Sequence, residues 1–145
     1  MRDYTKIQAW QLADDLTVAI YDQTRSFPKE ELYGLSRQLR RAAYSVPANI
    51  TEGSSRESEK DYLHFLYIAR GSLSETQYFV HLSRRLHYLQ DEQAEELLNQ
   101  VKQTFACLHG LIQAVEREAG KLTRMIATAT SLFALTVARF PVWGP

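Results

Sequence analysis

The chain has 145 residues, enough for one ordinary domain with a sizeable core. Its 17 basic and 17 acidic side chains balance, so there is no global attraction to nucleic acid or membrane, and such binding needs a local patch. A single cysteine, Cys107, excludes an intrachain disulfide, and the N-terminus lacks the apolar run of a signal peptide. We therefore expect a cytoplasmic protein that is not bound to a membrane.

The first predicted helix spans residues 5–25 and ends before Pro28. Its apolar residues recur at three- and four-residue steps, as in an amphipathic helix; they are Ile7, Trp10, Ala13, Leu16, Ala19 and Ile20. Because a proline disfavours helical backbone in the residue before it, we expect Phe27 to be extended.

The second predicted helix begins with an N-cap at Ser36 and ends at Gly53. Its apolar positions are Leu35, Leu39, Ala42, Val46 and Ile50. Pro47 lies inside this pattern, where it removes one backbone donor and clashes one turn back. We therefore expect a kinked second helix, with the kink between Tyr44 and Pro47.

The third predicted helix begins at Ser58 and runs to about Tyr88. Ser58 and Asp61, three residues later, can form an imperfect capping box. One apolar stripe consists of Tyr62, Leu66, Ala69, Leu73, Thr76 and Val80, and a second of Phe65, Ile68, Phe79, Leu82 and Leu86. Because a helix in a four-helix monomer buries only one face, we expect another face to meet a second subunit. The aromatic residues of this helix suit a core or a subunit interface better than a base-stacking platform.

The fourth predicted helix starts at Asp91 as an N-cap and carries a heptad seam of Ala94, Leu98, Val101, Phe105, Leu108, Ile112, Val115 and Ala119. Gly120 is a candidate stop, although Leu122 and Ile126 would continue the seam. We place a bundle domain at residues 1–120 and an apolar tail of undetermined structure at 121–145. The 14 uncharged residues between Arg124 and Arg139 are too few to span a membrane.

Four helices of similar length with short connectors predict an all-α protein, an antiparallel up-down four-helix bundle. Its densest polar stretch is on the second helix, where Arg37, Arg40 and Arg41 cluster and Arg56 follows. Guanidinium groups suit phosphate geometry, so these four are candidate nucleic-acid contacts. A solvated helix face with ion pairs to nearby glutamates is the alternative, which the neutral net charge favours.

Arg41, Asn49, Glu52 and Glu75 form a second candidate cluster. We expect a buried structural network that fixes helix register, because buried charges need partners. A catalytic carboxylate pair is the alternative, but nothing in the sequence indicates the pocket and proton donor that it requires. Only Asp61 and His64 come close to the Glu-x-x-His spacing of a di-iron site, so we expect no metal. The sequence also has no Gly-rich phosphate loop, and we expect no cofactor and no enzymatic activity.

Four segments carry a family resemblance: WQLA at residues 10–13, FPKEELYGL at 27–35, QLRRAAYSVPANITEG at 38–53 and FLYIARGSLSE at 65–75. They resemble bacterial 23S ribosomal RNA intervening sequence proteins, a group that includes accessory variability proteins of diversity-generating retroelements. The resemblance covers about residues 4–119, and the tail is not part of it.

The resemblance implies a bundle that assembles as a homopentamer, often around a central channel, with no established enzymatic activity and no cofactor. The retroelement relatives act with a reverse transcriptase and are basic enough to bind nucleic acid, whereas this chain is neutral. Two hypotheses follow. One is an oligomeric accessory protein associated with RNA or DNA, and the other is a scaffold that binds a reverse transcriptase or another protein without nucleic acid.

Overall fold

The structure is a computed structural model that describes the backbone of residues 2–137 and the side chains of residues 2–121 and of Arg124. Four long helices make up most of it: α1 (Gln8–Gln23), α2 (Leu35–Ser54), α3 (Glu59–Arg85) and α4 (Asp91–Val137). Single 3₁₀ turns lie at Tyr4–Lys6, Thr24–Ser26 and Lys29–Glu31. The described residues contain no strand, so the predicted all-α class is confirmed.

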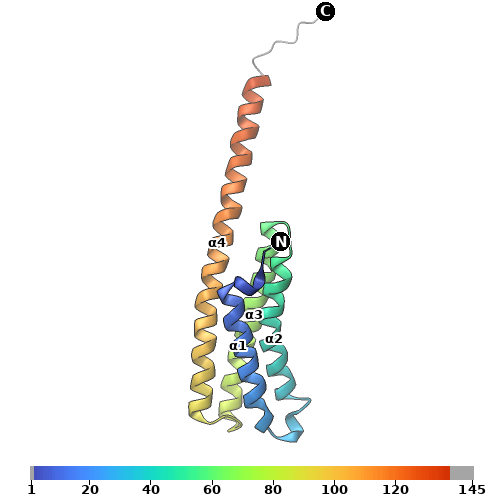
Figure 1. The fold of residues 1–145 in the computed structure, drawn as a ribbon, viewed down its shortest axis with the longest axis vertical. Coiled ribbons are helices and arrows are strands. Elements are labelled where there is room, and N and C mark those ends of the chain that lie inside the picture. Colours follow the sequence, from blue (N-terminus) through green and yellow to red (C-terminus); the bar gives the residue numbers. More distant parts are fainter. Residues whose placement is uncertain (1, 138–145) are drawn as a thin grey trace, which may run out of the picture.

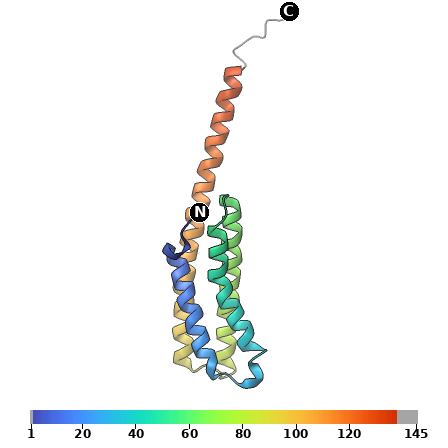
Figure 2. The same cartoon turned by 45° about the vertical axis from the view of Figure 1, so that its right-hand side comes forward.

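Successive helices run in opposite directions, as the two views of the ribbon show (Figures 1 and 2). α2 packs against α1 and α3, and α4 packs against α3 and α1, so the four helices close around one core. Short connectors at residues 55–58 and 86–90 force this antiparallel order. The predicted up-down four-helix bundle is confirmed.

Two predicted boundary features are present. Phe27, before Pro28, has extended backbone with φ −66° and ψ 152°. Ser58 is the N-cap of α3, because its Oγ accepts the Asp61 backbone N–H at 3.0 Å and donates to Asp61 Oδ2 at 2.7 Å. Local sequence therefore determines where the chain leaves α1 and where it enters α3.

The start of α2 differs from the prediction, because Gly34, and not Ser36, holds the N-cap position. The cap bond comes from the preceding turn, where Glu31 Oε2 accepts the backbone N–H of Leu35 at 2.8 Å. Ser36 is buried inside the first turn. α2 is one continuous helix across Pro47 to its end. The kink between Tyr44 and Pro47 stays a prediction.

The core takes one stripe from each helix. The first predicted stripe of α3, from Tyr62 to Val80, is fully buried, and so are Leu16, Leu39 and Ile50 on α1 and α2. On α4, Leu97 and Thr104 are buried, whereas Leu98 and Phe105 of the predicted seam are only half-buried. The seam of α4 is thus shifted by one residue at these two turns.

α4 is much longer than its neighbours and extends beyond the other three helices (Figure 1). Its 47 residues make a helix of about 70 Å at ~1.5 Å per residue, against about 40 Å for the 27 residues of α3. Its last buried side chain among those described is Val115, and the backbone continues as helix past Gly120 to Val137. Residues 138–145 of the predicted tail lie outside the described residues. No described helix contains an apolar stretch long enough to cross a membrane.

One face of α3 remains uncovered in the single chain. Ile68, Tyr78 and Leu86 are exposed by 39%, 58% and 44%, on the side away from the core residues Leu66 and Leu73. At 3.6 residues per turn the three lie within an arc of about 100°. The outer face of α3, defined by Ile68 and Tyr78 together with Leu86 at the C-cap of the helix, therefore presents apolar surface that the bundle itself does not bury.

Candidate nucleic-acid interface

Seven residues converge where α1 passes into α2, and we call them the Tyr–Arg surface: Tyr21, Leu32, Tyr33, Arg37, Arg40, Arg41 and Tyr44. Tyr21 comes from α1, Leu32 and Tyr33 from the connector, and the other four from α2. They line a surface pocket of about 560 Å³. That volume lies within the range of ~300–1,000 Å³ typical of ligand sites.

The four α2 residues of this surface share one helix face. Arg37, Arg40, Arg41 and Tyr44 are spaced at i, i+3, i+4 and i+7, which places them side by side. Arg37 lies in the first turn of α2, where the helix dipole disfavours cations. That turn has no acidic residue that would offset the charge. Charge placed against a local rule in this way points to a role outside stability.

Arg40 is held in place by α1 and the turn after it. Its Nε donates to Thr24 Oγ1 at 2.7 Å, and its guanidinium lies 4.9 Å from the ring centre of Tyr21. Thr24 is buried and donates its hydroxyl to the carbonyl of Ile20 at 2.7 Å. Arg40 is therefore a fixed, half-buried cation at the base of the surface.

Arg37 and Arg41 are exposed and have free guanidinium groups. Within the part of the chain that the structure describes, neither forms an ion pair or a hydrogen bond. In contrast, Arg2, Arg56 and Arg84 each bind a carboxylate. Two unpaired cations beside a fixed third cation give this neutral chain a locally basic surface.

Arg56, the fourth predicted contact, lies at the other end of α2. The helix has 20 residues and is about 30 Å long at ~1.5 Å per residue, so Arg56 is remote from Arg37. Arg56 forms an ion pair with Glu52, and its guanidinium lies 4.8 Å from the ring centre of Phe65. The structure thus brings three of the four predicted arginines together and leaves Arg56 in a separate contact between α2 and α3.

The predicted polar network is divided. Arg41 and Glu75 line one polar pocket of about 380 Å³ between α2 and α3, but both are exposed in the single chain. Asn49 donates to the carbonyl of Ser45 at 2.7 Å, and Glu52 pairs with Arg56. The four residues therefore do not form one buried network: Arg41 and Glu75 share an exposed pocket, whereas Asn49 and Glu52 make local contacts within α2 and with Arg56.

A serine pair links α2 to α3 beside these residues. Ser45 Oγ lies 3.0 Å from Ser72 Oγ, and Asn49 Nδ2 also donates to Ser45 Oγ at 3.0 Å. Both serines are half-buried. They form the polar contact between the two helices, and neither was among the residues predicted from sequence.

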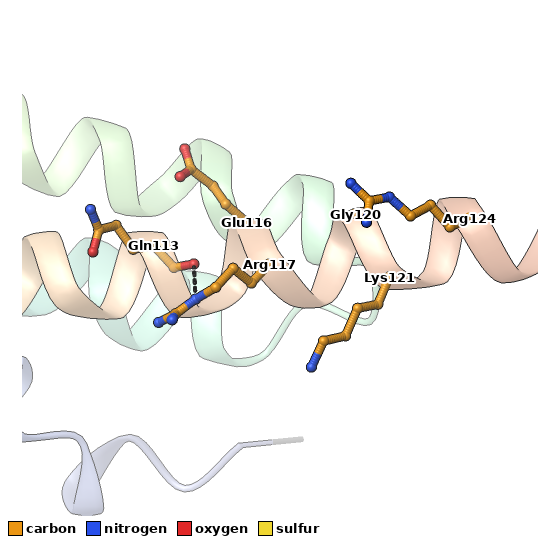
Figure 3. Close-up of a pocket in the computed structure, with 6 residues that line it drawn as sticks. All are labelled: Gln113, Glu116, Arg117, Gly120, Lys121 and Arg124. Carbon is orange, nitrogen blue, oxygen red and sulfur yellow. Dashed lines mark hydrogen bonds between the residues drawn. The ribbon is translucent and has the colours of Figure 1, made fainter.

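A second basic surface lies along α4, where Gln113, Glu116, Arg117, Gly120, Lys121 and Arg124 border an open pocket of about 620 Å³. All six belong to one helix, and the five side chains other than that of Gly120, which has none, point in different directions (Figure 3). Arg117 donates from Nε to the carbonyl of Gln113 at 3.2 Å, and Glu116 accepts a hydrogen bond from Tyr67. These side chains do not converge, so we favour the Tyr–Arg surface.

Three tyrosines outside the Tyr–Arg surface have a raised pKa. Burial raises the pKa of Tyr62 and of Tyr88, and the hydrogen bond to Glu116 raises the pKa of Tyr67. Each belongs to a contact between elements of the bundle, which accounts for its shift. Among the described residues, no three His, Cys, Asp or Glu side chains gather as they would around a metal ion.

Tyr21, Leu32, Tyr33 and Tyr44 are site residues that sequence reasoning missed. For Tyr44 a signal existed, because it follows Arg40 and Arg41 at helical spacing. For the other three no local signal existed, because α1 and the connector meet the face of α2 only through the bundle topology.

Together these features define a class: an up-down four-helix bundle with a local basic surface on a neutral chain. The family model of the 23S rRNA-intervening sequence protein matches residues 5–110. A similar solved structure, a protein with unknown function from the S23 ribosomal protein family of Bacteroides thetaiotaomicron, is 26% identical. The match covers 72% of this chain and 97% of that chain, with a TM-score of 0.67. No curated protein matches. The chain belongs to the 23S rRNA-intervening sequence protein family.

Proposed function

We propose that this protein is a non-enzymatic, cytoplasmic homo-oligomer that binds nucleic acid through the Tyr–Arg surface. The observation that carries the proposal is the pair of unpaired cations, Arg37 and Arg41, beside the fixed Arg40 in one pocket. Arginine forks bind phosphate with two donors, and phosphate contacts supply most of non-specific affinity. Because the net charge is zero, binding depends on this surface and not on the chain as a whole.

The homo-oligomer is supported by the outer face of α3. Its exposed apolar residues are expensive to leave in water, and a second copy of the chain would bury them. A closed ring gives each copy the same neighbours and prevents open-ended assembly. We propose a pentamer, the assembly that the family resemblance implies.

A binding assay on wild type and two double variants tests the nucleic-acid proposal. Fluorescence anisotropy with a labelled ribosomal RNA fragment at low salt should show binding by wild type. Arg37→Gln/Arg41→Gln should weaken it roughly tenfold or more, because two phosphate contacts are lost. The control Arg117→Gln/Lys121→Gln removes the same charge from α4 and should bind as wild type does.

The second candidate function is a protein-interaction scaffold. The neutral net charge and the half-exposed Leu32 in the pocket favour it. The same assay distinguishes it from a nucleic-acid-binding protein. Absence of RNA and DNA binding by wild type at low salt would remove the nucleic-acid proposal. Recovery of one stoichiometric protein partner, a reverse transcriptase for example, without nucleic acid would then support the scaffold.

A further inference from the structure

The Tyr–Arg surface contains as many tyrosines as arginines. Tyr33, Tyr44 and Tyr21 are exposed by 79%, 47% and 41%. A surface that bound phosphate alone would need only its cations. Three exposed aromatic rings within one pocket therefore require a second explanation.

The three rings are not equivalent. The guanidinium of Arg40 lies over the ring of Tyr21, so one face of that ring is already occupied. Among the residues that the structure describes, no other ring and no cation packs on Tyr33 or Tyr44. The pocket thus combines two free ring faces with two free guanidinium groups, those of Arg37 and Arg41.

This combination matches the chemistry of an unpaired nucleotide. Bases stack on aromatic side chains regardless of sequence, and a positive groove follows the phosphates. In a duplex the bases are stacked on one another, so that a duplex offers the pocket its phosphates, sugars and the edges of its bases but no free base face within the helix. Only a single strand uses both the rings and the cations.

Resting on the proposed function, we infer that the Tyr–Arg surface binds single-stranded nucleic acid, with phosphates on Arg37 and Arg41 and a base stacked on Tyr33 or Tyr44. Arg40, held by Thr24, keeps the Tyr21 ring in place as one wall of the pocket. Stacking accounts for affinity without sequence readout, since every base has a π-face.

The test compares a labelled oligouridine of about 12 nucleotides, within the ~4–16-nucleotide site size of single-strand binders, with an RNA duplex of equal length. Wild type should bind the single strand more tightly than the duplex. Tyr33→Leu/Tyr44→Leu should weaken single-strand binding roughly tenfold or more and leave duplex binding unchanged. Tyr4→Leu removes a half-buried tyrosine that packs on Trp10, outside both the Tyr–Arg surface and the outer face of α3, so this control should bind both probes as wild type does. Circular dichroism checks that each variant folds.

The outcomes separate this inference from the proposed function. In one outcome, Arg37→Gln/Arg41→Gln loses binding to single strand and duplex alike, and Tyr33→Leu/Tyr44→Leu binds both as wild type does. The surface then binds phosphates only. The inference is then wrong and the proposed function stands. If wild type binds neither probe at low salt, both fail.

Discussion

Gly53 lies near the end of α2, where α2 packs closely on α3. Among the helical glycines that the structure describes, it is the one at which an added Cβ would meet other atoms. A Cβ on Gly53 would come within 2.9 Å of both Phe65 Cβ and Tyr62 Cδ2. Contacts this short require α2 or α3 to move, since Phe65 Cβ is attached directly to the α3 backbone. Only glycine therefore fits this position without a shift.

Gly53→Ala should destabilise the protein by about 1 kcal/mol, because an overpacking cost of ~1–3 kcal/mol exceeds the helix-propensity gain of ~1 kcal/mol. Gly110→Ala is the matched control, since a Cβ at Gly110 has open space and should stabilise α4 by ~0.5–1 kcal/mol. Urea unfolding followed by circular dichroism, at one protein concentration, measures both. If the two substitutions change the free energy of unfolding in the same direction, the predicted overpacking at Gly53 is wrong.

Tyr62 gives the protein a specific dependence on alkaline pH. Burial raises its pKa, and the ring beneath Arg2 is only 1% exposed. A raised folded-state pKa means that the contribution of neutral Tyr62 is complete below the ordinary pKa of ~10 and declines as pH rises through the folded-state pKa.

Wild type should therefore lose stability relative to Tyr62→Phe as pH rises above ~10, whereas the difference should be constant at lower pH. The measurement is the free energy of unfolding of both proteins at several pH values. A difference that stays constant across the alkaline range would show that the Tyr62 hydroxyl titrates alike in the folded and unfolded chains.

At the scale of helices, sequence predicts more of the fold than of the site. The three- and four-residue steps locate all four helices, because burying one stripe is what stabilises each of them. Arg37, Arg40 and Arg41 were predicted together because helical spacing alone makes them neighbours. Arg56 was grouped with them by proximity in the sequence, but the length of α2 keeps it apart.

The predicted cap of α2 was wrong, and Tyr33 was missed, because both depend on the connector between α1 and α2. The cap of α2 comes from Glu31 in the preceding turn, and Tyr33 reaches the pocket from the connector. Neither contact follows from periodicity, because both depend on how the connector folds between α1 and α2. Gly120 was a candidate helix stop, but glycine costs a helix only ~1 kcal/mol, and α4 continues past it.

The outer face of α3 makes a prediction about assembly. Ile68→Lys should dissociate the oligomer, because it places a charge on the proposed interface, while the fold persists because Ile68 is already 39% exposed. Val18→Lys on α1, where Val18 is 57% exposed, makes the same chemical change elsewhere and should leave the oligomer intact. Sedimentation velocity measures both. Dissociation by Val18→Lys alone would move the interface to α1.

At the scale of the whole molecule, a neutral chain is proposed to bind a polyanion. A neutral chain can bind a polyanion only if the positive charge is concentrated on the Tyr–Arg surface and the acidic residues lie outside that surface. No acidic residue that the structure describes lines the pocket of the Tyr–Arg surface. The acidic side chain that shares a pocket with one of its arginines is Glu75, which lies with Arg41 in the neighbouring pocket between α2 and α3. In an oligomer, the surface is repeated once in each subunit, so that a single strand can meet several copies.

The salt dependence of single-strand binding tests this central claim most directly. The logarithm of the binding constant, plotted against the logarithm of salt concentration, has a slope of about −0.7 per phosphate contacted. Removing two contacts with Arg37→Gln/Arg41→Gln should make the slope shallower by about 1.4 relative to wild type. An unchanged slope in that variant, or a slope near zero in wild type, would contradict a phosphate-binding Tyr–Arg surface.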